Sequence, residues 1–460
     1  ADGGKGIAYA ANELCGIAAI PVLVEGMLMK DLHALAGQAR AAAWELAACP
    51  IEKRNAALLA MARELEAEKE TIFAAHKADL AAAESDGLAA PLVKRLRFGE
   101  EKLHAVLDGL HALVGLPDPI GKTTLSRELT PGLNLYRVTC PIGVVGVIFE
   151  SRPDALVQIA SLCLKSGNAA LLKGGREALR TNRALHTALA HALEAAGLPA
   201  GSLILLETRE DVGAMLKEDT LIDLIIPRGS NAFVRWIMDN SRIPVLGHSD
   251  GICHVYADRH ADISMAVKVA VDSKTQNVSV CNAMETLLVH RDIAEVFLPP
   301  LCAAMTAKGV ELRGDETTQK IIPCKPASPA DWDTEYLDLI LSIRVVDSLA
   351  DAITHINRHG SHHTDCIVTS DDAAASEFMR RVDSAGVYRN ASTRFADGFV
   401  YGFGAEVGIA TGKLHARGPM GLEGLTTYKY KLLGDGNTLA EMKDGSHRFT
   451  HVELGEDCPL

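Results

Sequence analysis

Three features are missing from this sequence, and each absence excludes a class of protein. No apolar stretch reaches the roughly 20 residues that a membrane-spanning helix needs, because Pro21, Glu25 and Gly26 interrupt residues 17–29. Positive charge is in deficit, since 46 Lys and Arg against 59 Asp and Glu give a net charge of −13; this argues against binding nucleic acid or anionic membranes through bulk charge. The ten cysteines include no C-x-x-C pair, so no zinc knuckle or redox pair is predicted. We expect a cytoplasmic protein with reduced thiols.

Two glycine-rich segments approach nucleotide-binding motifs without matching them. Residues 115–123 place five residues between their two glycines, where a phosphate-binding loop needs four. The spacing of Gly402, Gly404 and Gly408 also differs from the usual dinucleotide fingerprint. The sequence therefore argues against a nucleoside triphosphate site, and a nicotinamide cofactor would need another mode of binding.

The chain of 460 residues is long enough for two or three domains, at about 150 residues each. Hydrophobic residues at 48% and charged residues at 23% are typical of a folded protein with a large core. Residues 31–83 carry apolar side chains at helical spacing, which predicts two or three helices. Residues 140–246 then alternate apolar runs with helical segments, and a second such series begins at 252. This alternation predicts an α/β class with two doubly wound domains.

The alternating pattern assigns individual elements. Strands are predicted at 144–149, 169–173, 203–206, 222–226, 245–246, 252–256, 286–290, 343–346 and 365–369, and helices at 155–165, 177–196, 211–217, 231–239, 263–273, 349–359 and 373–383. The helix at 155–165 is apolar on most faces, so we expect it to be buried between layers.

Ser249 lies in Gly247-His-Ser-Asp-Gly251, which matches the G-x-S-x-G elbow of α/β hydrolases. The elbow requires a helix next, whereas residues 252–256 read as a strand. A glycine-flanked turn is the favoured interpretation, and a serine hydrolase remains a rival hypothesis.

Four histidines at and beyond the end of a predicted helix have spacing that suits a metal: His355, His359, His362 and His363. No Glu completes an H-E-x-x-H pattern, and histidines at a helix end also serve as partners of its carbonyl groups. No bound metal is predicted.

Cys281 has the most suggestive setting of the ten cysteines. It follows a predicted helix, has small and polar neighbours and precedes a β-rich run, which is typical of a loop thiol between two domains. A nucleophile there would need its pKa lowered toward neutrality by a cation or a helix dipole. The alternative is a small buried apolar side chain.

Seven segments together resemble the gamma-glutamyl phosphate reductase family, which belongs to the aldehyde dehydrogenase superfamily. They are Pro141-Ile-Gly-Val-Val-Gly146, Phe149-Glu-Ser-Arg-Pro-Asp154, Leu172-Lys-Gly-Gly-Arg-Glu177, Ile226-Pro-Arg-Gly-Ser230, Cys281-Asn-Ala-Met-Glu285, Asn390-Ala-Ser-Thr-Arg-Phe395 and Leu414-His-Ala-Arg-Gly-Pro419. The resemblance covers roughly residues 31–432. Residues 247–254 and 360–365 look closest to the reductase half of the delta-1-pyrroline-5-carboxylate synthases of plants and animals, without their glutamate kinase half.

The resemblance implies an aldehyde-dehydrogenase-like fold with a small β oligomerisation flap. An NADP-binding domain is expected from 31–123 and 139–250, a catalytic domain from 251–424 and the flap from 124–138 and 425–445. Residues 1–30 stay unassigned. A two-stranded flap is marginal alone, so we expect a homodimer or homotetramer, with a glutamate kinase as a further possible partner.

The resemblance also implies a reaction. L-glutamyl 5-phosphate and NADPH would give L-glutamate 5-semialdehyde, phosphate and NADP, in proline biosynthesis, through a thioester on Cys281. Arg152 falls where the superfamily has its oxyanion asparagine, and a cation there suits a phosphate leaving group; the alternative is a structural pairing with Glu150. Asn282 would support the oxyanion. The superfamily's glutamate that activates water has no counterpart in residues 246–251.

Cofactor and substrate residues follow from the same segments. The cofactor set implied by the resemblance is Lys173, Gly174, Arg176, Arg228, Gly229, Ser230 and Glu335, and the substrate set is Asn390, Arg394 and Arg417. Lys173 is expected near the adenosine ribose, Ser230 near the pyrophosphate and Glu335 near the nicotinamide ribose. Arg176 favours NADPH over NADH, unless it is a solvated surface arginine. Either Arg394 or Arg417 would take the α-carboxylate.

One residue departs from the family pattern. Val278 stands three residues before Cys281, where the family usually has proline. The loop backbone is therefore less constrained by its sequence. This departure keeps a rival hypothesis open, in which the chain binds NADPH without turnover.

Overall fold

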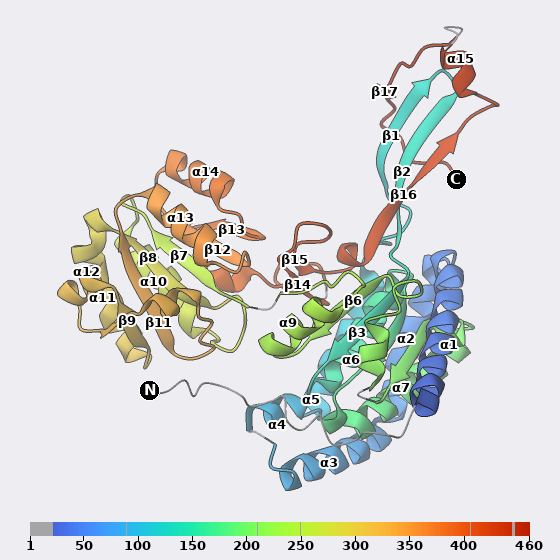
Figure 1. Ribbon diagram of the computed structural model, residues 1–460, viewed down its shortest axis with the longest axis horizontal. Helices are drawn as coiled ribbons and strands as arrows, with labels where there is room; N and C mark the ends of the chain where they lie inside the picture. Colours follow the sequence, from blue (N-terminus) through green and yellow to red (C-terminus); the bar gives the residue numbers. More distant parts are fainter. Residues whose placement is uncertain (1–21, 89, 209, 249, 405, 444–446) are drawn as a thin grey trace.

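Two α/β lobes and a projecting β arm make up the chain (Figure 1). The structure is a computed structural model that describes residues 22–460 except 89, 209, 249, 405 and 444–446. Residues 1–21 and Ser249, the nucleophile of the rival hydrolase hypothesis, lie outside the described residues. Among the helices that are described, none is both long and apolar enough to cross a membrane.

The first lobe packs helices around a four-stranded parallel sheet in the order β5-β4-β3-β6. Its strands are β3 (Val144–Phe149), β4 (Ala169–Lys173), β5 (Leu203–Leu206) and β6 (Leu224–Arg228), and its helices are α1 (Val22–Ala47), α2 (Ile51–Ala67), α3 (Lys69–Ser85), α4 (Ala90–Leu96), α5 (Glu100–Gly115), α6 (Pro153–Lys165), α7 (Leu179–Ala195), α8 (Glu210–Met215) and α9 (Asn231–Asn240). Every residue of β3 and β4 is buried, because helices cover both faces of the sheet. α6 is buried at most positions, as its composition predicts.

α1 begins at Val22, so part of the segment that the sequence left unassigned is helical. One expectation about the first lobe is wrong. Residues 245–246 form no strand, since Val245 makes only one isolated bridge with Ile225. The chain leaves the sheet directly afterwards, and Leu246 donates the last backbone hydrogen bond to Ile225 at 2.8 Å.

The second lobe has a seven-stranded parallel sheet in the order β10-β9-β11-β8-β7-β12-β13. Its strands are β7 (Cys253–Ala257), β8 (Met284–His290), β9 (Glu311–Gly314), β10 (Lys325–Pro326), β11 (Ile340–Val346), β12 (Thr364–Val368) and β13 (Gly386–Arg389), and its helices are α10 (Ile263–Thr275), α11 (Arg291–Ala307), α12 (Glu316–Ile321), α13 (Leu349–His359) and α14 (Asp372–Arg381). Val255 and Leu287 pack in the core beneath α10 and α11. Their neighbours Tyr256 and Leu288 pack beneath α13 and α14. Helices therefore cover both faces, as in a doubly wound sheet.

The arm is a four-stranded antiparallel sheet in the order β16-β2-β1-β17 (Figure 1). Its elements are β1 (Thr123–Thr130), β2 (Leu133–Pro141), β16 (Thr426–Leu433), the short helix α15 (Leu439–Lys443) and β17 (Val452–Glu453). The expected two-stranded flap is thus too small, because β16 and β17 flank the hairpin on either side. A hairpin of β14 (Gly408–Ala410) and β15 (Gly418–Met420) connects the second lobe to β16.

Candidate active site

A cleft with a cavity of about 740 Å³ separates the two lobes. One wall is formed where β3 and β6 end and where α6 and α9 begin, and the other wall carries the loop before β8. The cavity brings together the following residues of the predicted site: Arg152, Arg228, Gly229, Ser230, Cys281, Asn282, Glu335 and Arg394. Of the remaining predicted residues, Lys173, Gly174, Arg176, Asn390 and Arg417 are absent from its lining.

Cys281 faces a histidine that the sequence analysis did not connect with it. Nε2 of His363 lies 3.2 Å from Sγ of Cys281. His363 precedes β12 and Cys281 precedes β8, and both strands flank β7 in the sheet. Adjacent parallel strands begin at the same edge of a sheet, so this juxtaposition was available from the strand order alone. Nδ1 of His363 contacts Oγ1 of Thr364 at 2.9 Å, which orients the ring.

Burial governs the protonation of this pair. Burial raises the pKa of the Cys281 thiol to about 12, although the charge of Arg228 acts in the opposite direction. A nucleophile would need its pKa lowered toward neutrality, and burial acts here in the opposite direction. Burial also holds the pKa of His363 well below its ordinary value. These directions favour a neutral thiol that donates a hydrogen bond to a neutral imidazole.

The loop that carries Cys281 is fixed from both sides despite Val278. A Cβ atom at Gly251 would lie 2.2 Å from the carbonyl oxygen of Cys281, so only glycine fits there. Nδ2 of Asn282 donates to the carbonyl of Ala396 at 2.9 Å, and Oγ1 of Thr393 donates to the carbonyl of Asn282 at 2.7 Å. These contacts constrain the backbone on both sides of Cys281.

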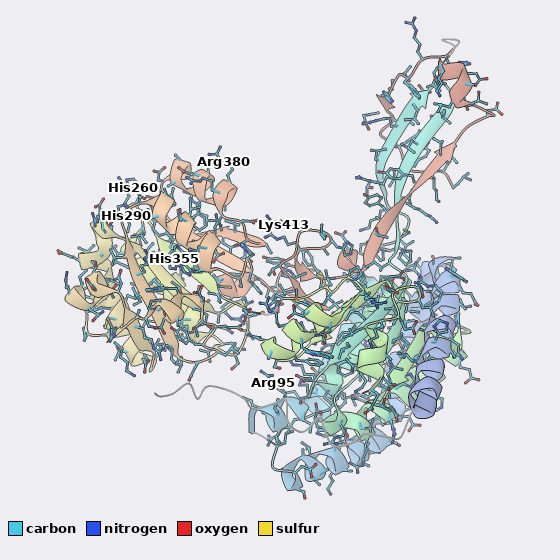
Figure 2. The ribbon with its side chains drawn as sticks, viewed as in Figure 1. Arg95, His260, His290, His355, Arg380 and Lys413 are labelled. Atoms are coloured by element: carbon cyan, nitrogen blue, oxygen red, sulfur yellow. The ribbon has the colours of Figure 1, made fainter. Side chains whose placement is uncertain are left out.

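Four arginines line the same cavity as the thiol. Arg95 of α4, Arg152, Arg228 and Arg394 all line the cavity, and Figure 2 shows Arg95 at the rim of the first lobe. Within the described residues, neither Arg95 nor Arg152 forms an ion pair. Burial and the neighbouring arginines lower the pKa of Arg152. Such a concentration of cations favours a ligand with more than one negative charge. No sequence signal pointed to Arg95, because only the fold brings α4 to the cleft.

The alternative role of Arg152 is not seen in the described part of the chain. Oε2 of Glu150 accepts instead from the backbone N–H of Ser230 at 3.1 Å. Gly229 lies against the same carboxylate, since a Cβ there would be 2.6 Å from Oε2 of Glu150. Arg228 lies 3.9 Å from Glu406, measured from Nη1 to Oε1. The guanidinium of Arg152 is therefore available to a ligand in the cavity.

Three of the predicted substrate or oxyanion groups are engaged in holding the fold. The amide of Asn390 bonds the backbone of Thr369 at 2.9 and 3.0 Å, away from the cavity. Arg417 donates to the carbonyls of Thr411 and Asp383 at 3.1 and 3.0 Å and lines a different cavity. Asn282 lines the cleft, yet one amide hydrogen is used by Ala396. Of the two candidate arginines, only Arg394 shares the cavity with Cys281.

The histidines singled out for a metal do not converge on one. His355 packs edge-on against His254 and Trp332, with ring centroids 5.5 Å away in each case. Nη1 of Arg344 lies 2.8 Å from its Nδ1, so that ring nitrogen is already engaged. Figure 2 places His355 within the second lobe. Of those four residues, His363 is the one that contacts Cys281 of the cleft in the described part of the chain.

Residues at the carboxyl edge of the first sheet fit a dinucleotide. α9 begins at Asn231, after the N-cap Ser230, whose side chain makes no capping hydrogen bond, and helix N-termini of this kind bind phosphate. Lys173 ends β4 and donates from Nζ to the carbonyl of Gly174 at 2.5 Å. Arg176 is exposed in the 3-10 helix η1 (Arg176–Ala178) and has no ion pair within the described residues. Glu335 contacts Nδ2 of Asn231, and burial raises its pKa.

Comparison with known proteins agrees with this geometry. The aldehyde dehydrogenase family matches residues 24–320. Gamma-glutamyl phosphate reductase of Pelotomaculum thermopropionicum is 57% identical over 427 residues, 93% of this chain and 98% of that protein. The crystal structure of gamma-glutamyl phosphate reductase from Thermotoga maritima has 40% identity and a TM-score of 0.87, covering 88% of this chain and 99% of that one. An engineered glycolyl-CoA reductase with bound NADP+ shares the fold at 16% identity and a TM-score of 0.61, covering 88% of this chain and 96% of that one. The chain therefore belongs to the aldehyde dehydrogenase family of oxidoreductases and, within it, to the gamma-glutamyl phosphate reductases.

Proposed function

We propose that this protein reduces L-glutamyl 5-phosphate with NADPH to L-glutamate 5-semialdehyde and releases phosphate, a step of proline biosynthesis. The observation that carries the proposal is the contact of 3.2 Å between Nε2 of His363 and Sγ of Cys281, which lines a cavity together with four arginines. The thiol belongs to the second lobe, and we assign the chemistry to a catalytic domain of residues 251–424. The facing lobe, residues 31–123 and 139–250, would bind the cofactor.

Two arginines are placed to hold the two ends of the substrate. Arg152, at the start of α6, would bind the acyl phosphate together with Arg95, since neither cation is neutralised by a carboxylate within the described residues. Arg394 would bind the α-carboxylate, and its Nε already donates to Oε1 of Gln276 at 2.8 Å, which fixes the side chain. This arrangement would orient the acyl carbon toward Sγ of Cys281.

His363 then takes the role of general base. As Sγ of Cys281 attacks the acyl carbon, the S–H proton moves to Nε2 of His363, so the thiol need not ionise beforehand. The bond to the phosphate oxygen breaks, and phosphate leaves toward Arg152 with its charge compensated. The acyl group remains on Cys281 as a thioester. An oxyanion at the carbonyl would be stabilised by Arg152 and by the second amide hydrogen of Asn282.

The cofactor supplies one chemical function, a hydride for the thioester carbon. Its pyrophosphate would bind the first N–H groups of α9 beyond Ser230, whose own N–H is engaged by Glu150. Lys173 and Glu335 would hold the two riboses, and Arg176 would hold the 2′-phosphate of NADPH. When the thiohemiacetal collapses, Cys281 leaves as thiolate and recovers its proton from His363, while the released phosphate takes one from solvent.

The test runs the reaction in reverse. Wild-type protein with glutamate semialdehyde, phosphate and NADP should produce reduced cofactor. Cys281→Ala should abolish this activity, whereas Cys302→Ala, on α11 and outside the cleft, should retain it. Activity that survives Cys281→Ala would overturn the assignment. Cofactor binding without turnover in the wild type would support the non-catalytic rival.

We further propose a homodimer or homotetramer built through the arm. β16 is an edge strand of its sheet and exposes Tyr428, Tyr430 and Leu432, and exposed apolar edges of this kind favour pairing with another chain. Light scattering of the wild type and of Tyr430→Lys should report a larger mass for the wild type. A monomeric wild type would contradict the proposal.

A further inference from the structure

A cluster of three metal-binding side chains lies at the base of the cleft. Ligand atoms of His248, Cys281 and His363 all lie within 4.8 Å of one another. The two imidazole rings meet edge to face, with centroids 5.2 Å apart. Tetrahedral zinc with bonds of about 2.0–2.3 Å requires donor atoms about 3–4 Å apart, which this cluster reaches with small side-chain shifts.

Each histidine is oriented through its other ring nitrogen. Nδ1 of His248 donates to the backbone carbonyl of Asp250 at 3.2 Å. Nδ1 of His363 contacts the hydroxyl of Thr364 at 2.9 Å. These contacts leave Nε2 of each ring for a ligand, and metal-binding histidines in proteins are held in this way.

We propose that this chain binds Zn²⁺ at the catalytic thiol, through Sγ of Cys281 and one ring nitrogen each of His248 and His363. A thiolate with two imidazoles is a donor set that zinc prefers over magnesium or calcium. The fourth coordination position faces the cavity of about 740 Å³ and would hold water or an anion. Only His363 is shared with the histidine group that the sequence suggested.

Zinc binding at this site changes the bonds and protons of the three side chains as follows. One Zn–S and two Zn–N bonds form, the thiol proton is released to solvent, and no electron is transferred. The metal occupies the lone pairs of both Cys281 and His363, so neither nucleophile nor base is available while it is bound. Zn²⁺ would therefore act as a reversible inhibitor, and a chelator would restore the free thiol.

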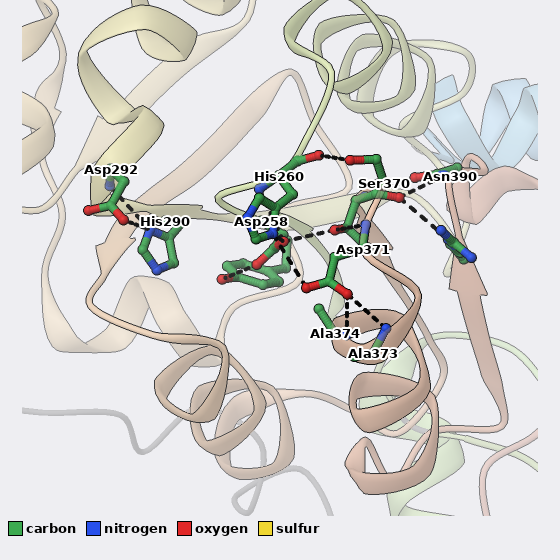
Figure 3. Close-up of polar contacts among 12 residues, drawn as sticks. Asp258, His260, His290, Asp292, Ser370, Asp371, Ala373, Ala374 and Asn390 are labelled. Atoms are coloured by element: carbon green, nitrogen blue, oxygen red, sulfur yellow. Dashed lines mark hydrogen bonds and ion pairs between the residues drawn. The ribbon is translucent and has the colours of Figure 1, made fainter.

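A second cluster of histidines and carboxylates provides a matched control (Figure 3). Nδ1 of His260 lies 3.7 Å from Asp258 and 3.4 Å from Asp371. Both carboxylates are engaged by the fold: Asp258 accepts from Thr369 at 2.8 Å, and Asp371 caps α14. His260→Gln thus removes a histidine near acidic groups without touching the cleft.

The experiment uses Co²⁺ as a spectroscopic probe in the full chain, without any turnover assay. Wild type should develop a thiolate-to-cobalt charge-transfer band at one equivalent, and equimolar Zn²⁺ should remove it. Cys281→Ser should lose the band, and His248→Gln should weaken cobalt affinity at least about tenfold, the effect of losing even an outer-shell partner. His260→Gln should match the wild type.

A second measurement uses only the wild type, so it does not depend on whether the variants fold. Zn²⁺ should slow alkylation of Cys281 by iodoacetamide, read by peptide mass spectrometry, and EDTA should restore the original rate. Unchanged alkylation with Zn²⁺, or a charge-transfer band that persists in Cys281→Ser, would overturn the zinc site. Neither readout depends on the reductase reaction, so failure of the zinc site and failure of the proposed function are distinguishable.

Discussion

Replacing His363 by asparagine removes the ring nitrogen that accepts the Cys281 proton while leaving a polar side chain in the buried site. With the thiol pKa at about 12, only about one molecule in 10⁵ carries a thiolate at pH 7. General-base catalysis contributes about 10²- to 10⁴-fold. We therefore expect kcat/KM to fall by that factor, equivalent to about 2.7–5.5 kcal/mol of transition-state stabilisation.

The same substitution should change the pH dependence. In wild type, the pKa of His363 is held well below its ordinary value and that of Cys281 lies near 12, so the reactive pair of thiol and neutral imidazole persists across neutral pH. Without the base, reaction depends on pre-formed thiolate, whose fraction rises tenfold with each pH unit below the thiol pKa. The logarithm of kcat/KM for His363→Asn should then rise with a slope of about 1 between about pH 7 and 9.

The assays are the reverse reaction, followed by reduced cofactor, and alkylation of Cys281 by iodoacetamide across the same pH range. His359→Asn is the matched control, because Nδ1 of His359 lies 2.8 Å from Oδ1 of Asp333 and His359 is not part of the cleft lining. A variant at residue 363 with wild-type rates and a flat pH profile would refute the assignment of His363 as base.

Three further substitutions test other parts of the cleft. Arg152→Gln should raise KM for phosphate about 10- to 100-fold in the reverse assay, as loss of a charged hydrogen bond predicts; an unchanged KM would remove Arg152 from the phosphate site. Arg176→Gln should lower the preference for NADPH over NADH by about fivefold, since the cation is exposed, measured as the ratio of the two kcat/KM values. Gly251→Ala should displace Cys281, because a Cβ there would lie 2.2 Å from the carbonyl oxygen of Cys281. Iodoacetamide should then no longer alkylate Cys281, and Tm should fall; a wild-type alkylation rate and Tm would contradict this.

Much of the fold could be predicted because buried parallel strands are short apolar runs with clear ends. β3 and β4 match the predicted 144–149 and 169–173, and α13 matches 349–359. α11 was not indicated, since Pro299 and Pro300 normally end a helix. Both prolines are exposed, and the buried side chains of the same helix hold it in place. β9 and β13 are short and partly polar, so no apolar run in the sequence predicts them.

The candidate site was less predictable, because it depends on contacts between distant segments. Cys281 could be chosen from its local sequence, but its partner lies 82 residues away and meets it only through the order of β8, β7 and β12. The choice between Arg394 and Arg417 likewise required the fold, which sends the second side chain to backbone carbonyls of another cavity. Local patterns identify reactive groups; the topology decides which of them meet.

The pairing of β16 with β2 has a mechanical consequence. The chain passes between the lobes after β6 and returns through β14 and β15 into β16, which is registered with β2 from Thr426 opposite Pro141 to Leu433 opposite Asn134. β2 continues directly into β3, the strand that leads to Arg152. Two attachment points restrict rotation to the line that joins them. With the lobes joined at these two places, any rotation of one lobe against the other would follow a single arc and would return the sulfur of Cys281 to the same position opposite the carboxyl edge of the first sheet.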